Sequence, residues 1–411
     1  MEHVIQPLIL FFTCMMTISY AEDFLQNPDF EIPPSNITTN SQYILLTKAN
    51  SIPGWSFNGT VSYVTSGANL LFPRSGGAHA LQLGENGAIN QTLRANTDET
   101  YNYVVSFNLI PQSEGCANNR TTVNVTLCEN PFRYRSMAFS LRRNLTANLW
   151  ESHAFFLGRL GVDESVDIRI ASVKAKNSKD GNNVTCWPMV DAFNVKMNPL
   201  PGWYSGNALA NGDFEVGPGF FKNSSEGILL DEEEDIFESP LQEWAISGTV
   251  KYIDSKHYKV PQGEAAIELL SGDSRSDPGV RIDLNLNTNY TYTLNFTMGD
   301  ANNSCVGDFT VYVQVGNNIH NFTMRSNGTG SASERSITFK SEFPSLIKTP
   351  IILYSVRESR TSYGVLCGPV IDNMILEGSD ERKIGSYGWR IKIHDGVSIF
   401  SMFTALVMLM V

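Results

Sequence analysis

The sequence predicts an all-β fold made of two tandem jelly-roll β-sandwiches, and three observations support this prediction. The first is a set of landmarks that occurs twice with one offset, since Trp55 and Trp244 are 189 positions apart. The same offset separates Gly59 from Gly248 and Cys116 from Cys305. The second is a hydrophobic pattern of period two. The third is that the alternating stretches are short and separated by turns rich in Asn, Gly and Ser, with no long capped stretch of helical period.

The repeat opens and closes on matching motifs. The first copy runs from the motif at 27–31, Asn-Pro-Asp-Phe-Glu, to the motif at 186–191, Cys-Trp-Pro-Met-Val-Asp. The second runs from 211–215, Asn-Gly-Asp-Phe-Glu, to 367–372, Cys-Gly-Pro-Val-Ile-Asp. This period is far too long for a solenoid repeat, so we expect two complete globular units.

Individual strands follow from the alternation. Tyr103, Val105 and Phe107 share one face of a strand, and the second copy has Tyr292, Leu294 and Phe296 at the same offset. Further strands are predicted at Val123, Val125 and Leu127, and at Phe309, Val311, Val313 and Val315. The stretch from Glu151 to Leu160 fits this pattern least well. Units of about 170–180 residues built from such strands favour a jelly roll of two antiparallel sheets.

The amino-terminal segment is expected to be a signal peptide covering residues 1–21. It is apolar from Leu8 to Ile18 and ends in Ser19-Tyr20-Ala21, with small residues at the positions that a signal peptidase reads. The segment has no Lys or Arg, but its apolar run is too short for a membrane span.

The carboxyl-terminal segment predicts a glycolipid (GPI) anchor. Residues 397–411 form a short apolar tail that anchoring would remove, and residues 379–396 form a polar spacer before it. Small residues that suit attachment are Ser379, Gly385 and Ser386. A short membrane span and an uncleaved tail are the alternatives. The protein is therefore expected on the outer face of the plasma membrane.

Secretion gives meaning to the sequons and cysteines. The first sandwich is expected at 22–198 and the second at 207–378, with a linker near 197–206 that is rich in Pro and Gly. Both carry Asn-x-Ser/Thr sequons that we expect to be glycosylated. These are Asn36, Asn58, Asn90, Asn119, Asn124, Asn144, Asn183, Asn223, Asn289, Asn295, Asn302, Asn321 and Asn327.

The cysteines predict one disulfide in each unit. Cys305 and Cys367 are the only pair available in the second unit, and the repeat carries this pairing over to Cys116 and Cys186 in the first. Cys128 is then left over and is expected to be a buried thiol. Spacing alone leaves the rival pairing of Cys116 with Cys128 open.

Charge and motifs exclude several classes of function. A net charge of −12 argues against nucleic acid as a partner, because phosphate backbones bind clustered Lys and Arg. The sequence has no serine-hydrolase elbow, zinc-protease helix motif or phosphate loop. The scattered histidines, such as His79, His153 and His257, are expected to be structural or exposed. We therefore expect a protein that is not an enzyme and that needs no cofactor.

The motifs together resemble the plant cell-wall family called "domain of unknown function 642". The resemblance covers residues 24–377 and is most specific in the second unit, because Pro28 and Trp187 depart from the family pattern in the first. It implies galactose-binding-like jelly rolls, secretion to the wall, and association with wall polysaccharide and pectin methylesterase, without catalytic residues. The motifs are Pro53-Gly54-Trp55 and those at 211–215, 248–253, 260–263, 298–305 and 367–372.

The acids at the ends of each copy form the first candidate site. Glu31 and Asp191 are expected to lie together, as are Glu215 and Asp372, because the first and last strands of a jelly roll can be neighbours. We expect them to bond to turns and backbone. A structural calcium site is an alternative, since Ca²⁺ prefers oxygen ligands, and a glycosidase acid pair is a second one.

Aromatic and basic residues form the sugar-binding candidates, because aromatic faces stack on sugars. Trp55 and Trp244 are expected in the core, and Tyr63 is a further aromatic candidate. A basic-aromatic stretch in an acidic chain could bind acidic pectin, although a solvated strand edge is the alternative. Its members are Lys251, Tyr252, Lys256, His257 and Tyr258.

Two charged segments complete the candidates. Arg133 and Arg135 share a strand face and could bind carboxylates. The acidic run at 231–235 is expected to be a solvated loop, with a basic partner as the alternative. The sequence thus predicts a surface protein that binds wall polysaccharide, with acidic pectin favoured. A module that docks pectin methylesterase, and an unrecognised carbohydrate-active enzyme, are the other hypotheses.

Overall fold

The computed structural model describes residues 24–380, apart from 37–40, 68–71, 74, 96, 98, 118–120, 131–132, 143, 174–184, 201–205, 272–275 and 344–345. The signal-peptide segment, the apolar tail, Asn119, Asn183, Gly385 and Ser386 lie outside the described residues. Within them the chain is all-β, as predicted, with one 3-10 turn, η1 (Glu114–Cys116), and no α-helix. None of the described residues forms a helix with the length and apolarity needed to cross a membrane.

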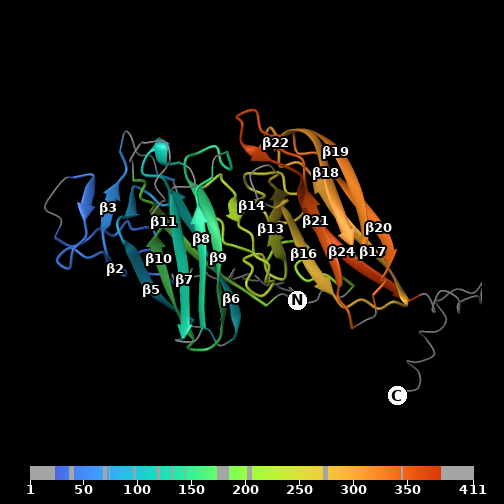
Figure 1. Ribbon diagram of the computed structural model, residues 1–411, viewed down its shortest axis with the longest axis horizontal. Helices are drawn as coiled ribbons and strands as arrows, with labels where there is room; N and C mark the ends of the chain where they lie inside the picture. The colour runs from blue at the N-terminus through green and yellow to red at the C-terminus, as the bar shows by residue number, and fades with distance from the viewer. Residues whose placement is uncertain are drawn as a thin grey trace, which may run out of the picture.

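The first copy of the repeat forms two antiparallel sheets (Figure 1). One has the order β1-β3-β4-β11-β6-β9 and the other β2-β5-β10-β7-β8. Their strands are β1 (Tyr43–Leu45), β2 (Ser56–Asn58), β3 (Val61–Thr65), β4 (His79–Leu83), β5 (Ala88–Arg94), β6 (Tyr101–Ile110), β7 (Thr122–Asn130), β8 (Arg133–Ser140), β9 (Glu151–Leu160), β10 (Ser165–Ser172) and β11 (Met189–Asn198).

The second copy repeats this arrangement with the orders β12-β14-β15-β24-β17-β20 and β13-β16-β21-β18-β19. Its strands are β12 (Ile228–Leu230), β13 (Ala245–Ser247), β14 (Val250–Asp254), β15 (Ala265–Leu269), β16 (Gly279–Leu284), β17 (Tyr290–Gly299), β18 (Val306–Val315), β19 (Asn318–Asn327), β20 (Ala332–Lys340), β21 (Thr349–Ser355), β22 (Ser359–Arg360), β23 (Leu366–Cys367) and β24 (Val370–Asp380). The short β22 and β23 pair only with each other. The tandem β-sandwich prediction is therefore confirmed.

The two sandwiches are joined edge to edge. Strand β9, the stretch that fitted the alternation least well, pairs in parallel with β12 through Leu229 and His153. This pairing merges one sheet of each copy into a continuous 12-stranded sheet. One hydrophobic cluster also spans the junction, because Val104, Ala154 and Phe156 pack with the core of the second sandwich. Burying such side chains contributes about 1.5–3 kcal/mol for each large one.

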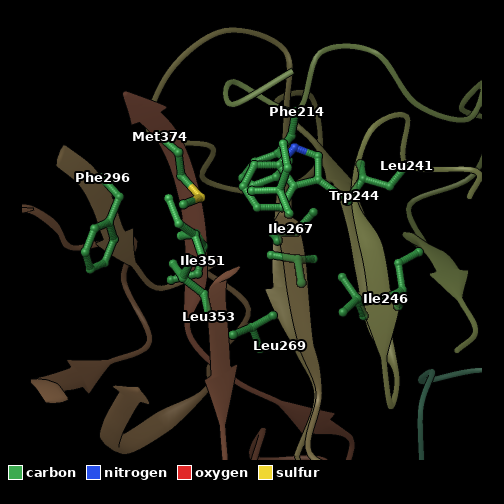
Figure 2. Close-up of a cluster of buried hydrophobic side chains, with 14 of the residues drawn as sticks. Phe214, Leu241, Trp244, Ile246, Ile267, Leu269, Phe296, Ile351, Leu353 and Met374 are labelled. Atoms are coloured by element: carbon green, nitrogen blue, oxygen red, sulfur yellow. The ribbon is translucent and has the colours of Figure 1, made fainter. Parts of the chain in front are cut away.

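Both cores contain the same pair of buried hydrogen bonds, from a tryptophan and a tyrosine side chain to backbone carbonyls of the opening turn, which we call the brace. The indole nitrogen of Trp55 donates to the Asn27 carbonyl at 3.1 Å, and that of Trp244 donates to the Asn211 carbonyl at 3.0 Å. Both tryptophans are buried, as predicted, and Figure 2 shows Trp244 against Phe214. A duplicated position that donates the same buried hydrogen bond is a structural position rather than a sugar platform.

The tyrosines that follow each tryptophan complete the brace. The Tyr63 hydroxyl donates to the Phe30 carbonyl at 3.1 Å, and the Tyr252 hydroxyl donates to the Phe214 carbonyl at 2.8 Å. Phe30 and Phe214 both have positive φ, 56° and 54°, which costs energy for a non-glycine residue. The buried rings and the tyrosine hydroxyls hold these strained turns in place.

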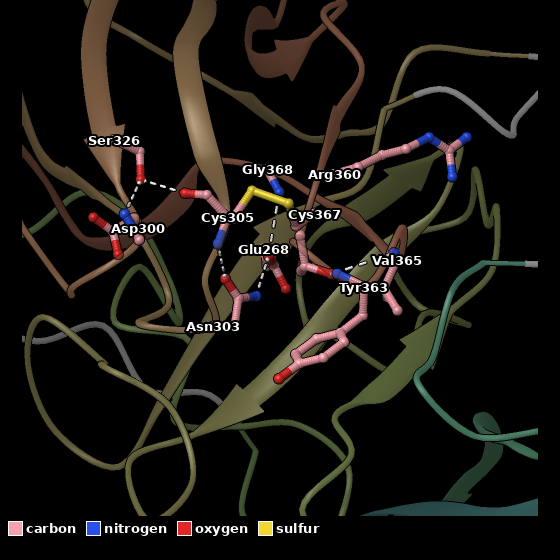
Figure 3. Close-up of a disulfide and its surroundings, with 12 residues drawn as sticks. Glu268, Asp300, Asn303, Cys305, Ser326, Arg360, Tyr363, Val365, Cys367 and Gly368 are labelled. Atoms are coloured by element: carbon pink, nitrogen blue, oxygen red, sulfur yellow. Dashed lines mark hydrogen bonds between the residues drawn. A yellow bond between two sulfur atoms is a disulfide. The ribbon is translucent and has the colours of Figure 1, made fainter.

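The predicted disulfides are both present. Cys116 is bonded to Cys186, and Cys305 is bonded to Cys367 (Figure 3). All four are buried. The expectation for Cys128 is wrong, because this thiol is free and exposed. It lies on β7, where alternation turns Val123, Val125 and Leu127 into the core and Cys128 outward.

Candidate functional site

The acids of the first copy bond to backbone, as expected. Glu31 Oε1 accepts hydrogen bonds from the backbone amides of Ala78 and His79, and Glu31 Oε2 lies 2.9 Å from the His79 imidazole. Asp191 is fully buried and its Oδ1 accepts from the Ala192 amide at 2.6 Å. Burial raises the pKa of Asp191 well above its ordinary value; the hydrogen bond from Ala192 opposes this, while the charges of Glu31 and Asp29 add to it.

The second copy has the same arrangement. Glu215 Oε1 accepts from the amides of Glu264 and Ala265 at 2.7 and 3.2 Å. Asp372 Oδ2 accepts from the Gln262 amide at 2.8 Å, and burial raises the pKa of Asp372 to about 7. Among the residues that the structure describes, no three His, Cys, Asp or Glu side chains are grouped so that they could hold a metal ion. The calcium site remains a prediction.

The basic-aromatic stretch does not form a surface patch, which corrects the prediction for Lys251 and Tyr252. Both are buried on β14 in the middle of the continuous sheet. The Tyr252 ring stacks on Phe220 at 4.8 Å between centroids. Lys251 Nζ lies 3.7 Å from the buried Glu268 carboxylate. Neither side chain can meet a polymer, because β12 and β15 flank this strand and side chains cover both of its faces.

The rest of the stretch follows β14 as a turn. Lys256 and His257 are exposed, and the His257 imidazole lies 2.9 Å from Asp254. Tyr258 is half-buried, and its hydroxyl accepts from the Gly227 amide at 3.2 Å. His257 also lines a groove of about 600 Å³ between the two sandwiches, with Trp150 among the other lining residues. The turn keeps two of the five predicted residues accessible.

Arg135 of the predicted arginine site pairs with Glu233 of the acidic run, which corrects the interpretation of this arginine as a ligand site. Glu232, Glu234 and Asp235 of the run are exposed, as predicted. Arg135 pairs with Glu233 and Glu238, and its guanidinium lies 4.6 Å from the centre of the Phe155 ring. Arg135 and Glu233 are each only 17% exposed as side chains. Arg133 begins β8, two residues earlier on the same strand. Arg135 therefore joins the sandwiches instead of presenting a charge to a ligand, and Glu233 is the residue of the acidic run that it holds.

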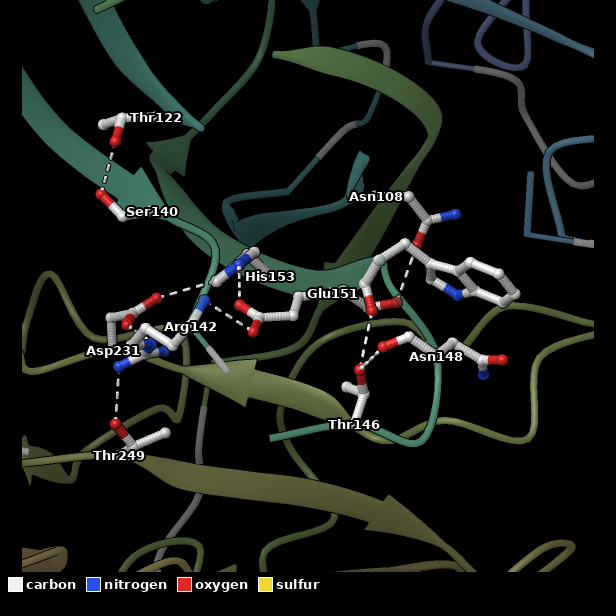
Figure 4. Close-up of polar contacts among 12 residues, drawn as sticks. Asn108, Thr122, Ser140, Arg142, Thr146, Asn148, Glu151, His153, Asp231 and Thr249 are labelled. Atoms are coloured by element: carbon white, nitrogen blue, oxygen red, sulfur yellow. Dashed lines mark hydrogen bonds and ion pairs between the residues drawn. The ribbon is translucent and has the colours of Figure 1, made fainter. Parts of the chain in front are cut away.

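A second set of charges closes the same junction (Figure 4). Arg142 Nη2 lies 2.7 Å from Asp231 Oδ1, and Arg142 Nη1 donates to the Thr249 hydroxyl at 2.7 Å. Burial disfavours the charged Asp231, but the charges of Arg142 and His153 outweigh it and lower its pKa. Sequence reasoning missed this contact, because Arg142 and Asp231 are about ninety positions apart in the chain.

The outer face of the second sandwich carries an aromatic pair that sequence reasoning missed. On the sheet β13-β16-β21-β18-β19, Phe309, Val311 and Val313 point into the core, so Tyr312 points outward. Tyr354 is its register partner on β21. The two rings stack with centroids 5.3 Å apart and planes 17° apart, and both are half-buried. They form a flat aromatic surface on central strands.

Gly279 and Arg281 border this pair on β16. Gly279 is the register partner of Tyr354, and a Cβ there would clash with the Leu353 carbonyl oxygen and lie 2.8 Å from the Tyr354 Cβ, so glycine permits the close approach of β21. Arg281, a side chain 52% exposed, bonds to Asp283 through two nitrogens at 2.9 and 3.0 Å. The pair thus has polar groups at its margin.

The first sandwich differs at the corresponding positions. Strand pairing places Ser56, Asn90 and Arg169 in one row across β2, β5 and β10, and Ala245, Arg281 and Ile352 in the matching row of the second sandwich. Two residues further along these strands, Ala171 lies where the second sandwich has Tyr354, and Asn124 lies where it has Tyr312. The aromatic pair is therefore specific to the second copy.

The predicted glycosylation asparagines that the structure describes are all exposed or half-buried. Of the anchor candidates, Ser379 lies within β24, where it pairs with Thr291 and its hydroxyl donates to the Thr291 carbonyl at 3.2 Å.

Comparison with known proteins gives low similarity to several solved structures. TmCBM61 in complex with β-1,4-galactotriose is 15% identical, with a TM-score of 0.27, and covers 43% of this chain and 98% of its own. The CBM22-1-CBM22-2 tandem domain from Paenibacillus barcinonensis Xyn10C is 9% identical, with a TM-score of 0.26, and covers 84% of this chain and 100% of its own. The ANX2 ectodomain from Arabidopsis thaliana is 8% identical, with a TM-score of 0.26, and covers 82% and 89%.

Sequence similarity is more specific. Protein TEEBE from Arabidopsis thaliana is 28% identical over 367 residues, which are 87% of this chain and 92% of that protein. Protein DUF642 L-galactono-1,4-lactone-responsive gene 2, also from Arabidopsis thaliana, is 29% identical over 368 residues, which are 88% and 92%. The family model described as "Protein of unknown function (DUF642)" matches residues 23–196 and 207–377, one segment for each copy of the repeat. This chain therefore belongs to the DUF642 family.

Proposed function

We propose that this protein binds a cell-wall polysaccharide through the outer face of its second sandwich. The observation that carries the proposal is the stacked pair of Tyr312 and Tyr354, half-buried on the central strands of that face. Aromatic faces pack against the apolar C–H surfaces of sugar rings. A flat pair on rigid strands suits consecutive residues of a polymer, because its rotamers are already fixed before binding.

The polar groups beside the aromatic pair set the orientation of the bound polymer. Arg281 and Asp283 provide donors and acceptors for sugar hydroxyls on one side. Acidic pectin is the first polymer to test, since the Arg281 guanidinium is more than half exposed and could pair with a uronate carboxylate. The sequence-based expectation of pectin binding rested on Lys251 and Tyr252. Both side chains are buried, so they do not support it.

A polysaccharide array followed by calorimetry on the full chain tests the proposal. Tyr312→Ala and Tyr354→Ala should each weaken binding by about twofold to tenfold, since stacking on an aromatic ring contributes roughly 0.5–1.5 kcal/mol beyond its buried area. Tyr363→Ala is the matched control, because Tyr363 is 85% exposed and belongs to the segment between β22 and β23, outside this sheet. If the Tyr312→Ala and Tyr354→Ala proteins both bind the polysaccharide as tightly as the wild-type protein, the proposal is overturned.

Two other outcomes would favour the other functions. Absence of glycan binding together with capture of purified pectin methylesterase would favour a docking module. Time-dependent release of sugar fragments by the pure protein would favour an enzyme.

The cellular location is part of the proposal. We propose attachment to the outer face of the plasma membrane by a glycolipid at Gly385 or Ser386, since Ser379 is already used in β24. Treatment of cell membranes with a phosphatidylinositol-specific phospholipase should release the protein into solution. Retention on the membrane would contradict the anchor without affecting the sugar-binding proposal.

A further inference from the structure

Three sequons of the first sandwich lie on one outer face. Asn58 on β2, Asn90 on β5 and Asn124 on β7 all occupy positions that alternation turns away from the core. Asn58 and Asn124 stand in one row with Ala88 and Ala171 between them. Neighbouring strands are about 4.8 Å apart, so these two asparagines are roughly 14 Å apart. Glycans at all three would leave the same sheet on the same side.

This face is also hollowed beside Asn90. A groove of about 950 Å³ runs over β5, β10 and β7, and Asn90 itself lines it. Its walls include Phe24, Arg94 and Asp167, which offer one aromatic ring and both charges. The volume lies within the ~300–1,000 Å³ of grooves that hold small ligands, and the mixture of ring and polar groups suits a sugar.

The amide of Asn90 is held in place by two neighbours. Arg169 Nη1 donates to Asn90 Oδ1 at 3.1 Å, and Asn90 Nδ2 donates to the Ser56 hydroxyl at 3.3 Å. A glycosylated asparagine keeps its Oδ1 and one hydrogen on Nδ2. Both contacts can therefore persist after modification, and they would fix the direction in which the glycan leaves the sheet.

We propose that the outer face of the first sandwich bears glycans and that the groove holds the chain's own N-linked glycan at Asn90. In the transfer, Asn90 Nδ2 bonds to the anomeric carbon of an oligosaccharide carried on a lipid diphosphate. The bond from that carbon to the diphosphate breaks, and the released lipid diphosphate takes the amide proton. No oxidation or reduction is involved.

The second sandwich lacks this arrangement at the matching positions. Asn58, Asn90 and Asn124 correspond there to Ser247, Arg281 and Tyr312. Its described sequons on the same sheet are on the edge strand β19, at Asn321 and Asn327. The sequons of the two outer faces are therefore placed differently: those of the first sandwich lie on β2, β5 and β7, whereas Asn321 of the second lies on the edge strand as the register partner of Tyr312.

Cys128 provides the test, because this exposed free thiol lines the same groove. The full chain, expressed in a eukaryotic host that glycosylates secreted proteins, is reacted with a bulky maleimide and followed by mass spectrometry. Asn90→Gln should accelerate labelling of Cys128 by about tenfold or more, since thiol reactivity follows access. Asn223→Gln, which removes an exposed sequon elsewhere, should leave the rate unchanged.

A second measurement covers the case in which Asn90→Gln fails to fold. Trimming the glycans of the folded wild-type protein to a single sugar with an endoglycosidase should also accelerate labelling. A peptide map that shows Asn90 unmodified overturns the proposal. Occupied Asn90 with a labelling rate that neither change alters also overturns it, because the glycan would then project away from the groove.

Discussion

His153 Nδ1 lies 2.9 Å from Asp231 Oδ2, although the imidazole belongs to the first sandwich and the carboxylate to the second. His153 is fully buried, and its Nε2 lies 3.3 Å from Glu151 Oε2 on the other side (Figure 4). Burial disfavours the charged imidazolium, but the hydrogen bonds and charges of Asp231 and Glu151 outweigh it and raise the pKa of His153. The junction therefore contains a proton that binds more tightly in the folded protein.

The first prediction is that the junction between the two sandwiches contributes less to the free energy of unfolding as pH rises. Because the folded pKa of His153 is above its unfolded value, its contribution is complete below about pH 6.5 and is lost as pH rises through the folded pKa. His153→Gln should remove this part of the pH dependence. Thermal unfolding of both proteins between about pH 5 and 8 checks it. Parallel curves for the two proteins would contradict the assignment.

The second prediction concerns Arg135. Arg135→Ala should lower the free energy of unfolding by about 3 kcal/mol, since it leaves Glu233 and Glu238 unpaired in a half-buried junction and removes the contact with Phe155. Arg325→Ala is the control, because Arg325 is exposed on β19. Urea denaturation measures both, and equal losses would mean that the junction adds no stability.

The third prediction concerns Asp372. Burial raises its folded pKa to about 7, the hydrogen bonds from Gln262 and Asn373 oppose this, and the charges of Glu215 and Asp213 add to it. The folded state then holds a proton that the unfolded state has released, so stability falls as pH rises from about 4 to 7. Asp372→Asn should flatten this fall. Melting temperatures over that range measure it, and an unchanged slope would contradict the assignment.

Calcium offers a contrasting outcome at the same residue. A bound cation favours the carboxylate, so added calcium would abolish the fall in stability with pH, and a chelator would restore it. The third prediction requires curves that calcium and chelator leave unchanged. Calorimetric titration with calcium on the wild-type protein and on Glu215→Gln distinguishes the two.

The fourth prediction concerns the disulfides. Replacing Cys305 and Cys367 by serine should cost about 2–5 kcal/mol, because the bond closes a loop across 62 positions and the two serine hydroxyls would be buried. Cys128→Ser should change stability by less than about 0.5 kcal/mol, since that thiol is exposed. Guanidinium denaturation compares the two. A small loss from the double substitution would indicate that the unfolded chain is already constrained.

The fold was largely predictable because duplication repeats its signals. The offset between Trp55 and Trp244 marks a brace whose buried hydrogen bonds recur in both copies. The pairing of Cys116 with Cys186 followed from the second copy by the same argument. The wrong expectation for Cys128 came from treating a leftover cysteine as a buried thiol, although alternation after Val125 and Leu127 already puts it on the outward face.

The site was less predictable, because its residues are distant in the chain. Tyr312 and Tyr354 become neighbours only through the pairing of β18 with β21. The signal was nevertheless present, since the inward run of Phe309, Val311 and Val313 puts Tyr312 outward. Lys251 and Tyr252 looked accessible because nothing in their local pattern shows that the strand will be flanked on both sides.

The shared hydrophobic cluster sets a limit on how this protein can be dissected. Cutting the chain near 201–205 would bare Val104, Ala154 and Phe156 on one fragment and the core surface that they cover on the other. Fragments with such faces tend to aggregate. The first copy thus supplies part of the interior of the second, so neither is expected to survive excision as a free-standing module.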